Sequence, residues 1–253
     1  MTEAAFFQWL TWGFAVLAPL IFLALLLITV PYGRYHRKGG WGPSFGGMIG
    51  WIVMELPAVV ALPCFLFLSA RAPGPVEVFF LAIWEMHYLH RTFVFPLRRR
   101  AYLEPVPMVV VLMGVAFNVG NGYLNGRWLG HFSPGYADSW LLDPRFLAGV
   151  AVFALGMAIN IHSNEVIFDL RRGGGGFQIP RRGMHRLVAS PNYLGEFLEW
   201  TGWALATWSF VGLVFAVWTF SNLAPRARSH LRWYRKTFPD YPPGRRAILP
   251  FVW

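Results

Sequence analysis

The sequence contains several apolar runs that are each long enough to cross a lipid bilayer as a helix. The hydrocarbon core of a bilayer is about 30 Å thick, and about 20 helical residues span it. Hydrophobic residues make up 56% of the 253 residues, whereas charged residues make up only 13%. No stretch shows the alternation that is typical of a membrane β-barrel strand. The sequence therefore predicts an all-α polytopic membrane protein.

The number of spans depends on the last apolar run, 193–224. At 1.5 Å per residue this run is too long for one untilted span and short for two. We expect it to divide near Ser209, which gives seven transmembrane helices in a single domain over residues 1–253. The other expected spans cover residues 6–30, 46–70, 76–97, 107–124 and 145–170.

Charge favours this division and sets the predicted orientation. With the N-terminus outside and the C-terminus in the cytoplasm, the inner segments carry 18 of the 22 Lys and Arg residues. A single last span would move the seven C-terminal charges outside, against the positive-inside tendency. The inner segments of this topology are 31–45, which contains Arg34, Arg37 and Lys38, then 98–105, 171–191 and 226–253.

The net charge of +10 is interpreted in the same way, as basic loops facing anionic lipid headgroups rather than nucleic acid. The first apolar run lacks a basic n-region and a small-residue cleavage site, so we expect a retained helix. The only cysteine, Cys64, excludes an intramolecular disulfide and a cysteine-based metal site. Arginine supplies nearly all the positive charge, which indicates a GC-rich, bacterial source, and hence an inner-membrane protein. In a eukaryote the corresponding location would be the endoplasmic reticulum membrane.

Hydrogen-bonding residues gather at the membrane edge between Gly156 and Trp200. One apolar helix ends in amides and a histidine, and the next begins with Asn192, Glu196 and Glu199, which share a helical face. An amide and two carboxylates suit ribose hydroxyls or a carboxamide, although pairing with loop arginines would also explain them. The residues at the end of the first helix are Asn160, His162, Ser163 and Asn164.

Two further stretches could contact an anionic ligand. The glycine run 173–176 lies between the pairs Arg171–Arg172 and Arg181–Arg182 and matches no known phosphate loop. Arginine binds phosphate bidentately, but most glycine runs are flexible linkers. In the tail 226–253, Arg226 and Tyr234 would suit a phosphate and an aromatic ring. Arg228, Arg232 and Lys236 are typical of a basic amphipathic helix on the membrane surface.

Ionisable residues inside predicted spans are functional candidates, because each costs roughly 2.5–3.5 kcal/mol to insert. Besides Glu196 and Glu199, they are Glu55, Glu85 and Arg91. The string MHYLHRTF places Tyr88 beside two histidines, and we interpret the histidines as an interhelical hydrogen-bond cluster rather than a metal site. A phenol facing Glu55 could bind a polar atom of an apolar substrate or polarise a carbonyl group.

Five strings in the chain resemble the steroid 5α-reductases, also called 3-oxo-5α-steroid 4-dehydrogenases. They are LHRTFVFPLRRR, AFNVGNGYLNG, ALGMAINIHSN, PNYLGEFLEWTGWALATWS and FPDYPPGRRAILPF. The resemblance runs from about Tyr32 to the C-terminus and is strongest to the mammalian type 2 form. It implies seven transmembrane helices, an NADPH cofactor and an enone lipid as substrate, with membrane lipid around the chain and no obligate protein partner.

The same resemblance implies roles for particular residues. Glu55 and Tyr88 would bind and polarise the C3 ketone of a 3-oxo-4-ene steroid, so that hydride adds to C5. Phe117, Trp200 and Met54 would line the substrate pocket. Met54 departs from the family, because the type 2 form has Gln there, and Asn164 and Gln178 replace Asp and Arg. The implied cofactor-binding residues are Asn160, Asn164, Arg171, Asn192, Glu196, Glu199, Arg226, Tyr234 and Arg245.

Two other functions fit parts of the sequence. The string SPNYLGE resembles membrane methyltransferases of the isoprenylcysteine type, which use S-adenosylmethionine. Those proteins usually carry an Arg-His-Pro triplet before it, where this chain has Ala189-Ser190-Pro191. A transporter with a proton relay of glutamates would be favoured by inverted repeats, and the sequence shows none.

Overall fold

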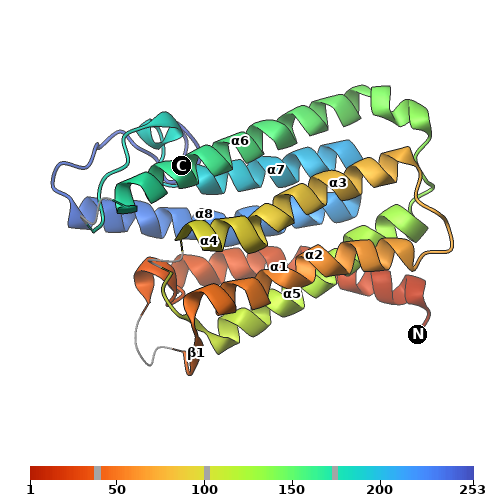
Figure 1. Cartoon of the computed structure of the whole chain (residues 1–253), viewed down its shortest axis with the longest axis horizontal. Helices are drawn as coiled ribbons and strands as arrows, with labels where there is room; N and C mark the ends of the chain where they lie inside the picture. Colours follow the sequence, from red (N-terminus) through yellow and green to blue (C-terminus); the bar gives the residue numbers. More distant parts are fainter. Residues whose placement is uncertain (37–40, 100–102, 173–175) are drawn as a thin grey trace. The chain divides into compact units, whose positions relative to one another are not determined.

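The computed structural model describes residues 1–36, 41–99, 103–172 and 176–253 (Figure 1). Arg37 and Lys38 of the first predicted inner loop lie outside the described residues, as do Arg100 and the glycines 173–175. The described residues pack as two compact units, and the prediction that they fold as one domain stays a prediction. Unit 1 comprises 1–12 and 30–143, and unit 2 comprises 13–29 and 144–253.

Unit 1 is built around the packing of α2 against α5. The glycines of α5 allow this approach, since a Cβ at Gly126 would lie 2.7 Å from the backbone oxygen of Leu62. Small residues at such contacts are typical of helix pairs in membranes. The helical elements of unit 1 after α1 are η1 (Gly33–Tyr35), α2 (Gly47–Phe67), α3 (Pro75–Leu89), η2 (His90–Val94), α4 (Phe95–Arg99), α5 (Met108–Arg127), η4 (Trp128–Phe132) and η5 (Asp138–Leu142).

The predicted third span is helical throughout but not uniform. The α-helix α3 leads directly into a π-helical turn, η2, and then into the short helix α4. π-Turns inside helices frequently occur at functional sites. A small antiparallel ladder, β1 (Ser44–Phe45) with β2 (Val106–Pro107), joins the segments before α2 and α5, so the described chain is not purely helical.

Unit 2 contains the long helices α6 (Pro144–Arg172), α7 (Pro191–Thr207) and α8 (Phe210–Thr237), with the 3-10 turn η6 (Gly183–Arg186) before α7. α6 and α7 lie side by side in Figure 1. Glycines line this contact in pairs: a Cβ at Gly156 would lie 2.6 Å from the backbone oxygen of Gly195, and a Cβ at Gly202 would lie 2.5 Å from that of Gly149. The pairing shows that the two helices run antiparallel with their backbones in direct contact.

Helix α1 (Glu3–Leu27) contributes residues to both units. In unit 1, the ring of Phe7 lies 4.1 Å from that of Phe132, and Arg127 makes two hydrogen bonds to Glu3, of 2.7 and 2.8 Å. In unit 2, the ring of Phe14 lies 4.9 Å from that of Trp218. The first predicted span is therefore a helix with side-chain contacts within each unit.

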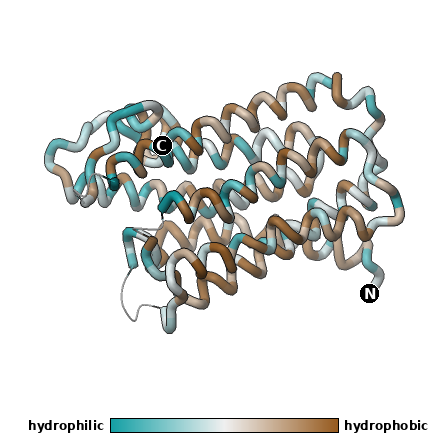
Figure 2. Tube along the Cα trace, viewed as in Figure 1, coloured by the Kyte–Doolittle hydropathy of each residue, from teal (hydrophilic) through white to brown (hydrophobic). Residues whose placement is uncertain are grey.

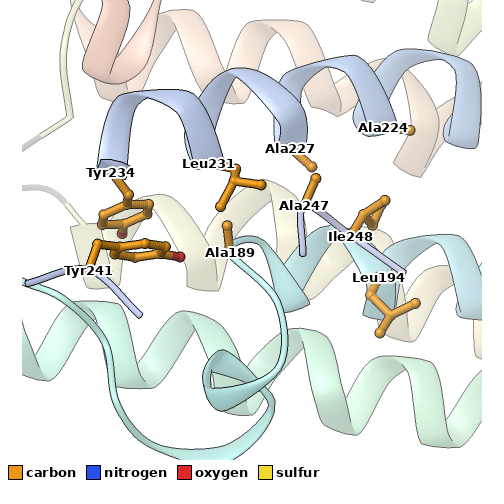
Figure 3. Close-up of a cluster of buried hydrophobic side chains, with 9 residues drawn as sticks. All are labelled: Ala189, Leu194, Ala224, Ala227, Leu231, Tyr234, Tyr241, Ala247 and Ile248. Atoms are coloured by element: carbon orange, nitrogen blue, oxygen red, sulfur yellow. The ribbon is translucent and has the colours of Figure 1, made fainter. Parts of the chain in front are cut away.

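The C-terminal half of α8 packs against the final segment of the chain. Figure 3 shows this cluster, in which the rings of Tyr234 and Tyr241 stack with centroids 5.1 Å apart. The buried members of the cluster are Ala189, Leu194, Ala224, Ala227, Leu231, Tyr234, Tyr241, Ala247 and Ile248. The tail after residue 226 is thus part of the folded core of unit 2.

The structure shows where α8 begins and ends. The basic residues expected on a surface helix belong to α8, which continues through Pro225 as far as Thr237. Pro225 is buried inside the helix, so the neighbouring packing outweighs the lost backbone hydrogen bond. The break near Ser209 is confirmed: Trp208 has a left-handed backbone, with φ of 46°, and the Ser209 hydroxyl caps α8 by accepting from the Gly212 N–H.

Among the described residues, five helices are long and apolar enough to cross a bilayer by themselves: α1, α2, α5 continued into η4, α6 and α8. Figure 2 shows hydrophobic residues along these helices. α3 and α7 have only 15 and 17 residues and carry buried glutamates. The structure is therefore that of a helical membrane protein, and the spans formed by α3 and α7 stay predictions.

Candidate active site

The buried carboxylate of Glu55 in unit 1 forms an ion pair with Arg91. Glu55 lies in the middle of α2 and is 4% exposed, and its Oε1 accepts a hydrogen bond of 2.9 Å from the Nε of Arg91 on η2. An ionisable group costs free energy in an apolar environment unless it is paired. The pair therefore explains how α2 can carry a glutamate at this depth, and it joins α2 to the helical stretch that begins with α3.

Tyr88 belongs to that same stretch. Its side chain is 3% exposed, and its ring lies 4.8 Å from the ring of Trp84 and 4.9 Å from that of His87. The His87 ring thus packs edge-on against that of Tyr88, and the predicted hydrogen-bond cluster of the histidines stays a prediction. Both residues expected to bind the ketone, Glu55 and Tyr88, are buried in unit 1.

The two expected pocket residues of unit 1 lie on facing helices. Met54 on α2 packs against Gly114 of α5, and its backbone oxygen accepts a hydrogen bond of 2.8 Å from the Asn118 side chain. Phe117 lies next to Asn118 and is partly exposed. Asn118, Asn121 and Asn125, which share one face of α5, are all buried.

In unit 2, the amides of α6 and α7 form one hydrogen-bonded chain. Asn160 donates to the backbone oxygen of Asn192 at 2.9 Å and accepts from Asn164 at 3.0 Å. The glycine contact places these groups, because a Cβ at Gly195 would lie 2.5 Å from the backbone N of Asn160. The structure thus brings together three residues that lie up to 32 positions apart in the sequence.

The two glutamates of α7 continue this face. Glu196 is 9% exposed and Glu199 is fully buried, and Glu199 lies against Gly156 of α6. Trp200 follows them and is buried in an aromatic cluster, with its ring 4.3 Å from Phe215 and 6.0 Å from Phe153. Of the three residues predicted to share this face, Glu196 and Glu199 are buried and Asn192 is partly exposed.

Arg245 is the most deeply buried cation of unit 2 among the described residues, at 4% exposed. The segment before α7 holds it in place: the Arg246 N–H donates to Leu187 and the Ala189 N–H donates to Arg246. Its Nη1 donates to the Pro180 oxygen at 2.8 Å, while its Nε has no hydrogen-bond partner in the described part of the chain. A buried guanidinium with an unused donor suits an anion such as phosphate.

Arg171 and Arg226 are half-buried residues of α6 and α8. The Arg171 guanidinium carbon lies 3.4 Å from the centroid of the Phe177 ring. The neighbouring arginines, by contrast, make ion pairs at the surface: Arg172 with Glu165 and Asp169, Arg181 with Asp240, and Arg182 with Asp169. The predicted phosphate contact of Arg171 stays a prediction.

These residues fit an NADPH cofactor by their chemistry. Amides and carboxylates suit the carboxamide and the ribose hydroxyls, and the aromatic pair Tyr234–Tyr241 with buried Arg245 suits a ring and a phosphate. No group of three or more His, Cys, Asp or Glu side chains in the described ranges could hold a metal ion.

Sequence reasoning did not find two contacts of this region. Ser190, just before α7, shares a hydrogen bond of 3.0 Å with the Nδ1 of His230, and the His185 ring bonds to the Ser163 oxygen at 3.1 Å. Both join segments far apart in the chain, and no local pattern signals them. The string SPNYLGE includes Ser190, but it was interpreted only through its resemblance to membrane methyltransferases.

Fold and site together define the class as a helical membrane protein with buried polar groups on α6 and α7. A family model described as 3-oxo-5-alpha-steroid 4-dehydrogenase matches residues 104–253. The chain belongs to this family of oxidoreductase enzymes.

Curated relatives from plants and mammals support this assignment along the whole chain. Steroid 5-alpha-reductase DET2 of Arabidopsis thaliana is 37% identical over 100% of this chain and 99% of its own. The 3-oxo-5-alpha-steroid 4-dehydrogenase 1 of Bos taurus is 41% identical over 93% of each chain, and that of Homo sapiens is 42% identical over 87% of this chain and 85% of its own. These mammalian relatives are type 1 enzymes, whereas the motifs had indicated the strongest resemblance to type 2. The likeness also extends into the first helix.

Proposed function

We propose that this enzyme reduces the 4,5 double bond of 3-oxo-4-ene steroids to 5α-3-oxosteroids, with NADPH as the reductant. The names of the relatives supply the reaction, since they are steroid 5-alpha-reductases and 3-oxo-5-alpha-steroid 4-dehydrogenases. The observation that carries the cofactor proposal is the buried Arg245, whose Nε has no partner in the described residues. Backbone hydrogen bonds of the neighbouring Arg246 place it beside the segment before α7.

The proposed roles of the residues follow from the charge that the reaction creates. Adding hydride to C5 of the enone pushes electrons onto the C3 oxygen, and a proton then adds to C4. Tyr88 would donate a hydrogen bond to that oxygen, where negative charge develops, and Glu55 would help to hold the ketone. NADPH, when bound, would supply the hydride. A buried site strengthens each hydrogen bond to the developing enolate and keeps water away from the reacting atoms.

The cofactor would be held by unit 2. Asn160, Asn164 and Asn192 would bind its amide and hydroxyl groups, together with Glu196 and Glu199. The remaining proposed contacts, Arg171, Arg226, Tyr234 and Arg245, would bind its phosphates and one ring. Phe117, Trp200 and Met54 would shape the apolar part of the substrate site.

We also propose the topology of seven spans with the N-terminus outside and the C-terminus in the cytoplasm, in a bacterial inner membrane. The charge distribution supports this proposal. It places the start of α7, the end of α6 and the final segment on the cytoplasmic side, where NADPH is available.

The test is NADPH oxidation by the purified, detergent-solubilised enzyme with testosterone or progesterone as substrate. The configuration at C5 of the product is determined in the same experiment. Oxidation with a 5α product is the expected result. If NADPH stabilises the protein thermally but no steroid is reduced, the substrate is another enone lipid. If S-adenosylmethionine stabilises the protein and NADPH does not, the methyltransferase alternative replaces this proposal.

A further inference from the structure

The contacts around Arg91 join the two elements that carry the proposed ketone-binding residues. Glu55 lies on α2, and Tyr88 lies on α3, three residues before Arg91 in the continuous helical stretch of α3 and η2. The Arg91 side chain crosses to α2 and donates to Glu55 at 2.9 Å. This hydrogen bond therefore links Glu55 to the helical stretch that carries Tyr88.

A second residue of α2 holds the same arginine. Trp51 precedes Glu55 by four residues and so shares its helical face. The Trp51 indole N–H donates to the backbone oxygen of Arg91 at 2.9 Å, and its ring centroid lies 5.2 Å from the Arg91 guanidinium carbon. Trp51 thus holds Arg91 at its backbone oxygen, and both Trp51 and Glu55 contact its guanidinium group. An isolated interhelical ion pair would need only the contact with Glu55.

The π-helical turn explains how the backbone of Arg91 reaches Trp51. In η2 the N–H of Phe95 bonds to the His90 oxygen, five residues back, so the turn is wider than an α-helical turn. Widening a turn frees backbone oxygens from their usual partners. The Arg91 oxygen accepts the indole hydrogen bond at this position.

The ion pair also fixes one oxygen of the Glu55 side chain, because Oε1 accepts from Arg91. In the proposed reaction Tyr88 donates to the C3 oxygen, and Glu55 helps to hold the ketone from a position that Arg91 sets. This reasoning rests on the proposed function.

We propose that Arg91 is a positioning residue for enone reduction. Its contacts with Trp51 and Glu55 fix the Glu55 carboxylate of α2 relative to Tyr88. It acts through Glu55 and not by touching the substrate. Its removal should therefore lower the rate of the chemical step more than it weakens the binding of cofactor or steroid.

The experiment is a kinetic double-mutant cycle with Arg91→Gln, Glu55→Gln and the double variant, in the full-length enzyme with NADPH and testosterone. A misplacement of about 1 Å can cost about 10²-fold in rate. We expect Arg91→Gln to lower kcat by about 10- to 10²-fold with little change in either KM. In the Glu55→Gln background the same change should have no further effect, because residues that act as a unit are not additive.

Two further variants separate positioning from stability. Arg91→Lys keeps the charge but loses the fork of donors, so it should recover part of the lost kcat. Arg99→Gln removes an arginine that stacks on Phe95 in α4, at 5.4 Å, and should leave kcat unchanged. Thermal stabilisation by NADPH in each variant shows that the protein is folded, including the double variant, in which no buried charge is left without its partner.

The outcomes are distinct. A wild-type enzyme that reduces no enone overturns the proposed function and this inference with it. An active wild type with Arg91→Gln near wild-type kcat overturns the inference alone. Equal losses from Arg91→Gln with and without Glu55→Gln also overturn it, because Arg91 would then act independently of Glu55.

Discussion

Buried ionic groups in this chain are satisfied in different ways. Buried Glu55 is paired with Arg91, and buried Arg127 donates two hydrogen bonds to the exposed Glu3 and one of 2.9 Å to Ser69. Each of these pairs joins two helices of unit 1. Arg245 differs, since its Nε has no partner among the described residues. Paired groups hold helices together, whereas a buried donor without a partner is available to a ligand.

The phenol of Tyr88 is the first residue to test. Replacing Tyr88 with Phe should lower kcat by about 10²-fold, the loss typical of one positioned hydrogen-bond donor. NADPH should still stabilise the protein, because only one hydroxyl is removed. Steady-state kinetics with testosterone gives the result, and Tyr136→Phe, which alters a hydroxyl bonded to Trp128 at 3.2 Å in the loop after α5, is the matched control. Full activity of Tyr88→Phe would exclude this phenol from the chemistry.

Arg171 and Arg182 give a matched comparison for the cofactor phosphate. Arg182 is bonded to Asp169 at 2.7 Å on the surface, whereas Arg171 stacks on Phe177. Arg171→Ala should raise the KM for NADPH more than that for NADH if it contacts the 2′-phosphate, which only NADPH carries. Arg182→Ala should change neither. Equal effects of Arg171→Ala on both cofactors would point instead to the pyrophosphate or to a structural role.

At the scale of elements, the contact between α6 and α7 determines where the polar groups lie. Close backbone approach at glycines permits Cα–H···O contacts and dense packing in a membrane environment. The same contact sets Asn160 against Asn192 and Glu199 against Gly156. The position of these polar groups therefore results from the packing of α6 against α7 and not from loops alone.

Gly195→Ala tests this dependence. The added Cβ would lie 2.5 Å from the Asn160 backbone N and 2.6 Å from the Gly156 oxygen, so the helices must move apart. Overpacking of this kind typically costs about 1–3 kcal/mol. We expect a lower Tm and a loss of NADPH stabilisation, measured by thermal unfolding in detergent. Gly13→Ala in α1, where a Cβ meets nothing within 4 Å, should change neither quantity. An unchanged NADPH response in Gly195→Ala would separate the glycine contact from cofactor binding.

Most element bounds could be predicted from hydropathy, because a helix that crosses a bilayer is apolar over a known length. The break at Ser209 could also be predicted, since the distribution of arginines requires two helices there. The continuation of α8 through Pro225 could not be, because burial of Ala224 and Ala227 against the last segment overrides the local effect of proline. Predicting the division into two units would have required long-range contacts that no local pattern encodes.

The site, too, could be predicted only in part. Burial of Glu55, Tyr88, Glu196 and Glu199 follows from their place in apolar runs. The partner of Glu55 could not be predicted, because Arg91 was one of several cations that could reach the carboxylate. The π-turn that presents the backbone oxygen of Arg91 has no sequence signature here. The family resemblance named the residues, and the structure shows what several of them contact.

For the molecule as a whole, stability should fall in strongly alkaline solution. Burial raises the pKa of the Tyr136 phenol to about 12, and burial also raises the pKa of Tyr241. Both groups lie outside the five candidate spans. An ordinary tyrosine has a pKa of about 10, so the unfolded chain loses these protons first. Their contribution to stability is complete below pH 10 and is lost as the pH rises towards 12.

Thermal unfolding between pH 9 and pH 11 measures this loss. The Tm of the wild type should fall more steeply with pH than that of Tyr136→Phe, because the variant lacks one of the two titrating groups. The slope is compared and not the absolute Tm, since the variant also loses the hydrogen bond from Trp128. Parallel slopes would show that Tyr136 has the same proton affinity in the folded and unfolded chains.

The paired glycines of α6 and α7 have a mechanical consequence. Gly149 faces Gly202 and Gly156 faces Gly195, so both pairs are spaced by seven residues along their helices. If one helix slid along the other by a single residue, side chains would replace hydrogen atoms at both contacts and collide with backbone. The two helices can therefore not ratchet past each other. We therefore expect α6 and α7 to move together as one body.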